Sequence, residues 1–157
     1  MIVRFGVLAL AGLLQMGQLD APGPAKPKSY VVYGAEQQTV AAGKKGVLEL
    51  KFTVNDGFHV NSHTPKSELL IPTNLTLKPA DGVKALPAEY PKGQEYSFSF
   101  EPGEKLDVYS GAFTVKVPVE AAKGDHTVDG VLRYQACDHA ACYPPKSLPV
   151  SVVFTAK

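Results

Sequence analysis

The sequence predicts an all-β fold, an immunoglobulin-like β-sandwich, and three observations support this. Apolar residues recur with period two in several short segments. Turns rich in proline, glycine, asparagine and aspartate separate these segments, and no helical periodicity of any length follows residue 28. Six to nine short strands joined by such turns are typical of a sandwich. A small closed barrel fits the same pattern and stays open as the alternative.

The clearest alternation covers residues 48–54 and stops at the turn Asn55-Asp56-Gly57. The other alternating segments are, in order along the chain, residues 75–77, 96–100, 113–119, 128–134 and 148–154. Two prolines, Pro118 and Pro149, occupy outward-facing positions of these segments. Because proline cannot donate a ladder hydrogen bond, we expect both at sheet edges or strand ends.

The N-terminus is predicted to be a signal peptide over residues 1–20. Arg4 precedes an unbroken run of apolar and small residues, 5–14, which is far shorter than the ~20 residues that span a bilayer. The proline-rich residues 21–28 then form a leader, and residues 29–157 form one domain. No later segment is long and apolar enough to cross a membrane, so we expect an exported chain without stable membrane insertion once mature.

The charge distribution argues against one large class of function. Sixteen basic and fifteen acidic residues give a net charge of +1, and neither sign forms a block. A nucleic-acid-binding domain normally shows a concentrated basic face. Nucleic acid is therefore excluded as a partner, and no glycine-rich phosphate loop or internal repeat is present.

The two cysteines, Cys137 and Cys142, are separated by four residues. In an exported protein such a pair is normally oxidised to a disulfide. In the chain-entropy model, a disulfide that closes so short a loop stabilises the fold by roughly 2 kcal/mol, against ~4.7 kcal/mol for a loop of a hundred residues. The bond is therefore a weak stabilising cross-link. A short bridge at an exposed strand end is accessible to an attacking thiolate. Spacing alone leaves a redox role and a structural role evenly balanced.

A metal site is the third interpretation. Cys137, His139 and Cys142, with His59 or His63 from elsewhere, form a set of zinc or copper ligands. The Cys-x-His-x-x-Cys spacing, however, lacks the paired Cys-x-x-Cys arms of common zinc sites. We therefore expect His59 and His63 to be surface or hydrogen-bonded histidines.

The segment around the cysteines resembles a known active site. Residues 134–145 read Tyr-Gln-Ala-Cys-Asp-His-Ala-Ala-Cys-Tyr-Pro-Pro. This segment is similar to the active-site segment of the N-terminal periplasmic domain of the thiol:disulfide interchange protein DsbD. Residues 57–65, 70–77 and 109–119 support the resemblance, which covers about Ser29 to Phe154. It implies an immunoglobulin-like sandwich in the bacterial periplasm that needs no cofactor.

The resemblance also implies a function, as one component of a thiol-disulfide oxidoreductase. The cysteine pair would take electrons from a membrane-embedded thiol donor and pass them to periplasmic thioredoxin-fold proteins, among them disulfide isomerases and cytochrome c maturation factors. Cys142 would form the mixed disulfide with partners, and Cys137 would resolve it. The flanking residues expected to line the site are Tyr134, Asp138, His139 and Tyr143. A periplasmic binding module with a purely structural disulfide stays open as the alternative.

Two features of the family have no clear counterpart here. The family covers its disulfide with an aromatic residue of a cap loop, for which Phe98 and Phe100 are the nearest candidates. Phe98 holds a period-two core position and is expected in the core, whereas Phe100 stays a candidate for lining the site. The full interchange protein continues into membrane and thioredoxin-like domains, whereas this sequence ends at Lys157, so we expect a separately encoded donor.

Overall fold

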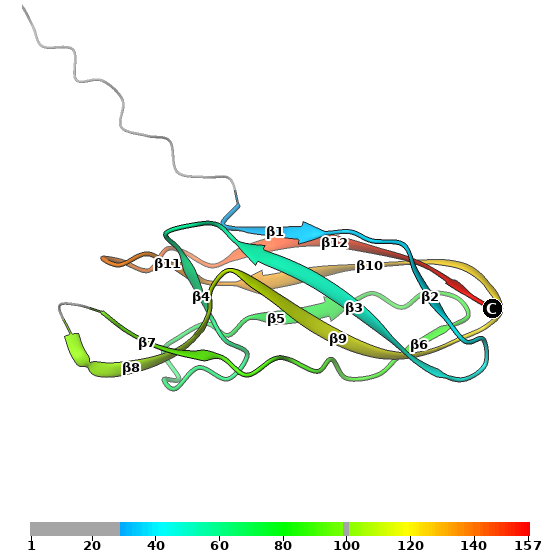
Figure 1. Ribbon diagram of the computed structural model, residues 1–157, viewed down its shortest axis with the longest axis horizontal. Coiled ribbons are helices and arrows are strands. Elements are labelled where there is room, and N and C mark those ends of the chain that lie inside the picture. The colour runs from blue at the N-terminus through cyan, green and yellow to red at the C-terminus, as the bar shows by residue number, and fades with distance from the viewer. Residues whose placement is uncertain (1–28, 99–100) are drawn as a thin grey trace, which may run out of the picture.

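The computed structural model describes residues 29–98 and 101–157, and these form an all-β sandwich (Figure 1). The predicted signal peptide, the leader and Phe100 lie outside the described residues. The strands are β1 (Val31–Gly34), β2 (Gln38–Val40), β3 (Lys45–Val54), β4 (His59–Asn61), β5 (Asn74–Leu77), β6 (Val83–Ala85), β7 (Gln94–Phe98), β8 (Glu101–Tyr109), β9 (Ala112–Ala121), β10 (Gly124–Tyr134), β11 (Ala136–Cys137) and β12 (Lys146–Ala156). Across these two stretches no helix is present that could cross a membrane.

The strands form three sheets of four strands each, with the orders β1-β3-β9-β6, β2-β12-β10-β5 and β11-β4-β8-β7. The first two sheets are the layers of the sandwich. The third is a small sheet gathered at one end of the molecule, opposite the C-terminus (Figure 1). The fold class predicted from the sequence is confirmed.

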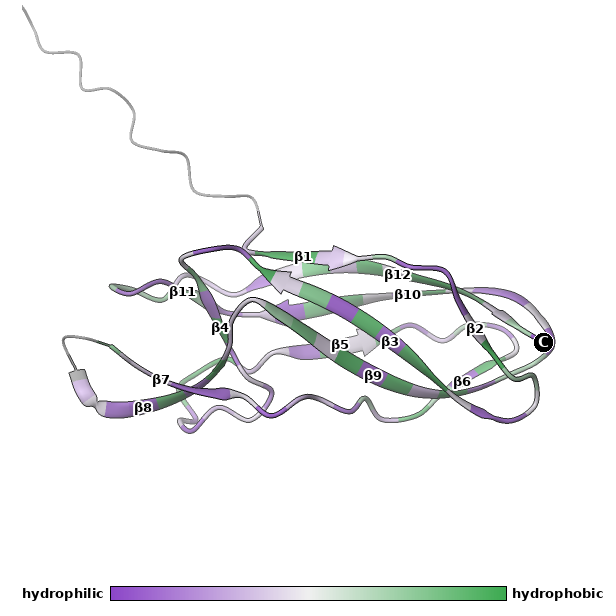
Figure 2. Cartoon of the chain, viewed as in Figure 1, coloured by the Kyte–Doolittle hydropathy of each residue, from purple (hydrophilic) through white to green (hydrophobic). Residues whose placement is uncertain are grey.

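The core follows from the alternation that predicted the strands. In β3 the side chains of Leu48, Leu50, Phe52 and Val54 are buried, while the residues between them are exposed. Figure 2 shows the resulting bands of hydrophobic and hydrophilic residues along this strand. Apolar residues of β9, β10 and β12 complete the core from both layers. Each fully buried side chain of this kind contributes about 1.5–3 kcal/mol of transfer free energy.

The two strand prolines behave differently. Pro149 of β12 is exposed, and β2 pairs with β12 only from Phe154 onward, so the predicted edge position is confirmed. Pro118 is buried, so its predicted outward exposure is wrong. Its carbonyl accepts a hydrogen bond from the backbone N–H of Leu86 (2.8 Å), but its nitrogen cannot return one. This loss explains why the pairing of β6 with β9 ends beside Pro118.

The cysteine segment connects a layer of the sandwich with the small sheet at its end. After β10 ends at Tyr134, the chain leaves the sandwich layer and forms β11, which pairs with β4 in the small sheet. It returns through an isolated bridge between Cys137 and Cys142 and enters β12 at Lys146. The disulfide therefore lies in a connection at one end of the sandwich, as the sequence predicted (Figure 1).

Candidate functional site

Cys137 and Cys142 form a disulfide, with Cα atoms 3.9 Å apart, and this confirms the predicted pairing. The two cysteines differ sharply in their exposure. Cys137, held in β11, is 0% exposed, whereas Cys142 follows the 138–141 loop and is exposed. A reagent from solution therefore reaches the bond from the Cys142 side.

Cys137 belongs to a small buried cluster that is separate from the sandwich core. Its other buried members are Phe98, Leu106 and Val108, and Leu70 and Tyr96 pack against them. The antiparallel pair β7–β8 supplies most of these side chains. Phe98 is buried as predicted, at 8% exposure, but its neighbours are those of the disulfide rather than the main core.

His59 lies directly opposite Cys137 in the pairing of β4 with β11. Its ring centroid is 4.0 Å from that of Tyr96 and 6.0 Å from that of Phe98, and the residue is 4% exposed. Burial lowers the pKa of His59, and the nearby Asp138 carboxylate partly offsets this effect. The buried Nε2 atom has no hydrogen-bond partner among the described residues. The prediction of a surface or hydrogen-bonded histidine is therefore wrong for His59.

His63 fits that prediction. Its Nδ1 lies 3.0 Å from the carbonyl oxygen of Thr73, and its ring stacks on Tyr90 with centroids 3.7 Å apart. This arrangement gives His63 a structural environment that does not include the cysteines.

Asp138 organises the loop between the cysteines. The backbone N–H groups of Ala140 and Ala141 donate to its Oδ1, both at 2.8 Å, and the Tyr143 hydroxyl donates to its Oδ2. The Tyr143 bond and then these two amides lower the pKa of the Asp138 carboxyl from 3.8 to about 2. The carboxylate is therefore charged throughout the neutral range, immediately beside Cys137.

Aromatic rings surround the end of this loop. Tyr143 stacks on Tyr30 at 5.2 Å between centroids, and Phe58 lies 4.7 Å from Tyr30. The hydrogen bond to Asp138 raises the pKa of the Tyr143 hydroxyl. The other two predicted lining residues lie elsewhere. His139 is exposed in the loop, and Tyr134 is buried in the sandwich core. The Tyr134 hydroxyl accepts a hydrogen bond from the backbone of Tyr30 (3.1 Å).

Gln135 fastens the cysteine segment to the small sheet. Its Nε2 donates to the carbonyl of Tyr143 (3.2 Å). Its Oε1 accepts from the backbone N–H of Ile71 (3.2 Å) and from Nδ2 of Asn61 (3.1 Å). One amide side chain thus links the residue after Cys142, the segment leading into β5, and strand β4. Gln135 lies inside the cysteine motif, but no sequence pattern indicates its hydrogen-bond partners.

Gln135→Leu is expected to destabilise the oxidised protein by about 2 kcal/mol. Leucine has a similar size but leaves the partners of Gln135, two of them backbone groups, without their hydrogen bonds, which costs about 1–3 kcal/mol per buried group. Urea denaturation would measure the change. Gln37 is exposed, and its one side-chain bond, to Thr155, is long (3.4 Å). Gln37→Leu should therefore change stability by less than about 0.5 kcal/mol. Equal effects of the two variants would contradict the role of Gln135.

The described residues do not contain the metal site considered from the sequence. No three His, Cys, Asp or Glu side chains come together there in a way that could hold a metal ion. In the oxidised state, moreover, both sulfurs are committed to the disulfide, and zinc requires deprotonated thiolates.

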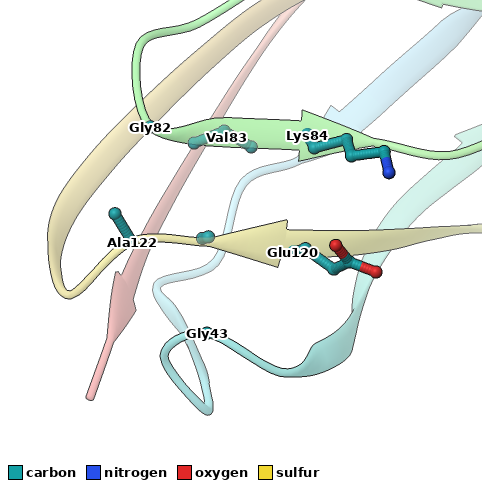
Figure 3. Close-up of a pocket in the computed structure, with 7 residues that line it drawn as sticks. Gly43, Gly82, Val83, Lys84, Glu120 and Ala122 are labelled. Carbon is teal, nitrogen blue, oxygen red and sulfur yellow. The ribbon is translucent and has the colours of Figure 1, made fainter.

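A hollow elsewhere on the molecule has no connection with the disulfide. It lies at the opposite end of the sandwich, and Figure 3 shows the side chains that surround it. Its lining consists of Gly43, Gly82, Val83, Lys84, Glu120, Ala121 and Ala122. Lys84 and Glu120 are register partners of β6 and β9. None of these residues is a nucleophile of the cysteine or serine type, so this hollow offers no chemistry comparable to that of the disulfide.

A family model decides the family of the chain. Residues 30–153 match the model described as "Thiol:disulfide interchange protein DsbD, N-terminal". The chain belongs to this family. The resemblance noted in residues 134–145 is thereby confirmed, and the matched range spans both sandwich layers and the disulfide of this DsbD N-terminal-type domain.

Solved structures show the same fold. One is the DsbD N-terminal domain of Neisseria meningitidis in complex with the PilB N-terminal domain. It is 22% identical, covers 85% of this chain and 90% of that chain, and has a TM-score of 0.50. Another is the N-terminal periplasmic domain of ScsB from Proteus mirabilis, which is 10% identical with a TM-score of 0.51. That match covers 78% of this chain and 44% of the ScsB chain. Comparison with curated proteins finds no match.

Proposed function

We propose that this DsbD N-terminal-type domain is a periplasmic thiol:disulfide exchange module that works through Cys137 and Cys142. The single observation that carries the proposal is the contrast between an exposed Cys142 and a fully buried Cys137 in one disulfide. A purely structural bond gains nothing from one accessible sulfur, whereas exchange requires an attacking thiolate to reach one sulfur while the other leaves.

The exchange proceeds in two displacements. A thiolate of the electron donor attacks Sγ of Cys142, so that a donor–Cys142 bond forms, the Cys137–Cys142 bond breaks, and the electron pair passes to Sγ of Cys137. The second thiolate of the donor then displaces Cys142, which leaves a reduced pair and an oxidised donor. In the onward transfer the Cys142 thiolate attacks the disulfide of an acceptor, and Cys137 resolves the mixed disulfide. Each of the two transfers moves two electrons, first from the donor to the cysteine pair and then from the pair to the acceptor, and no cofactor takes part.

The family and the relatives support proposals for the partners and the compartment. The proposed donor is a membrane-embedded thiol protein, and the proposed acceptors are thioredoxin-fold proteins, cytochrome c maturation factors among them. The Neisseria meningitidis DsbD N-terminal domain has been found in complex with the PilB N-terminal domain, which supports a protein partner. The ScsB relative is a periplasmic domain, and the signal peptide proposed for residues 1–20 agrees with export.

The reduction potential of the Cys137–Cys142 couple tests this function against a binding module with a structural disulfide. Structural disulfides typically lie below about −300 mV, whereas exchange-active ones are less negative. Equilibration with dithiol buffers of known potential should therefore give a value above about −300 mV. Because the short loop contributes only roughly 2 kcal/mol, the reduced protein should also stay folded by circular dichroism. A potential well below −300 mV would show that the disulfide is structural.

A further inference from the structure

Opening the disulfide creates a charge in an unfavourable place. When a thiolate attacks Cys142, the electron pair of the broken bond arrives on Cys137, which is 0% exposed. Phe98, Leu106 and Val108 surround this residue and offer no side-chain hydrogen-bond donor, whereas Tyr96, which packs against them, carries a hydroxyl. The neighbouring Asp138 carboxylate is negative as well. A buried anion without a donor is costly, so the exchange proposed above needs a group that faces Cys137 and stabilises its thiolate.

His59 is placed to be that group. It is the register partner of Cys137 in antiparallel strands, and directly opposite residues carry their side chains on the same face, with Cβ atoms about 4.5–5.5 Å apart. The imidazole also lies against the tilted rings of Tyr96 and Phe98. The side chain therefore lies within the cluster that contains the buried sulfur.

The second observation is the state of its Nε2 atom. This nitrogen is buried and has no hydrogen-bond partner within residues 29–98 and 101–157. Buried polar atoms are nearly always hydrogen-bonded, and an exception in a native structure calls for an explanation. A partner that becomes a strong acceptor only after the disulfide opens explains it, because a disulfide sulfur is a weak acceptor whereas a thiolate is a strong one.

We infer that His59 donates a hydrogen bond from Nε2 to the Cys137 sulfur once the disulfide opens. This inference rests on the exchange function proposed above. In the step, the donor–Cys142 bond forms, the Cys137–Cys142 bond breaks, and the electron pair goes to Cys137. The imidazole stays neutral and keeps its proton, so charge is conserved between the attacking and the leaving thiolate. The lowered pKa of His59 agrees with a neutral ring at pH 7.

Two substitutions test the inference on the full chain. His59→Phe keeps a ring but removes the donor, and should slow reduction of the disulfide by dithiothreitol by about tenfold or more, as expected for a lost hydrogen bond to a charged group. His59→Gln keeps an N–H donor and should stay closer to the wild type. Tyr96→Phe is the matched control, because it removes the hydroxyl of Tyr96 while keeping the ring that packs on His59. A His59→Phe rate equal to that of the wild type would overturn the inference, as would an equal loss in Tyr96→Phe.

A measurement on the unsubstituted protein covers the case in which His59→Phe does not fold. The ¹⁵N resonance of His59 Nε2 should shift on reduction, while those of His63 and His126, which contact backbone carbonyls away from the disulfide, should not. An unchanged His59 resonance would refute the hydrogen bond. The exchange function fails separately, through a reduction potential well below about −300 mV in the wild type.

Discussion

Cys137→Ser is expected to turn a transient mixed disulfide into a stable one. The substitution leaves the exposed Cys142 as a free thiol and removes the only thiol in the described residues that could resolve its bond to a partner. Mixed with periplasmic extract under non-reducing conditions, this variant should form a covalent adduct with thioredoxin-fold proteins. Electrophoresis without reductant, followed by mass spectrometry of the adduct, would identify them.

Cys142→Ser is the matched control, since it has the same composition but keeps the buried cysteine. Cys137 is 0% exposed, and a partner thiol cannot reach its sulfur without displacing the side chains of Phe98, Leu106 and Val108 that pack around it. We expect capture to fall by about tenfold or more, because exchange rates depend on access to the attacked sulfur. Equal capture by both variants would contradict the assigned order of the cysteines. Capture by neither would contradict the exchange function itself.

The long strands could be predicted because a strand with one buried face alternates apolar and polar residues along the sequence. In β3 the pattern Leu48, Leu50, Phe52, Val54 is enough to identify the strand and its inward face. Strands β2, β4, β6 and β11 have three residues or fewer, and so short a segment contains too few repeats of a two-residue period to indicate a strand. These strands depend on pairing with distant segments, which no local pattern records.

The candidate site likewise contains residues that the sequence could indicate and residues that it could not. Cys137, Asp138 and Tyr143 act within one short loop, so the motif that contains them indicated the disulfide and its neighbours. His59 comes from β4 and Tyr96 from β7, more than thirty residues apart along the chain, and the order β11-β4-β8-β7 brings both to the disulfide. From the sequence, His59 is associated with the cysteines only as a candidate metal ligand, and no pattern indicates that Tyr96 lies beside it. The sheet topology is therefore what places His59 beside both Cys137 and Tyr96.

Asp138→Asn is expected to make the reduction potential of the cysteine pair less negative. Asparagine keeps an oxygen for the N–H groups of Ala140 and Ala141, but removes the negative charge that opposes a thiolate at Cys137. Removing such a neighbour lowers a thiol pKa by about one unit, and a tenfold change in the equilibrium constant corresponds to about 30 mV. Equilibration with dithiol buffers at low ionic strength would measure the shift.

Tyr143→Phe separates the charge from the hydrogen bond. It removes the same Tyr143–Asp138 bond that Asp138→Asn weakens, yet keeps the carboxylate, so its potential should stay close to that of the wild type. Similar shifts in the two variants would show that loop geometry, and not charge, sets the potential.

The wild type and Asp138→Asn should also differ in how their stability depends on pH in acid. The folded pKa of Asp138, about 2, lies below its ordinary value of 3.8. Its contribution to stability is therefore fully present above about pH 4 and is lost as the pH falls toward 2. Urea denaturation between pH 5 and pH 2 should show a steeper loss for the wild type than for Asp138→Asn, because asparagine does not titrate. The contribution should shrink in high salt, since the carboxylate lies near the surface, where counterions screen it. Parallel pH profiles of the two proteins would mean that the carboxylate does not stabilise the loop through its charge.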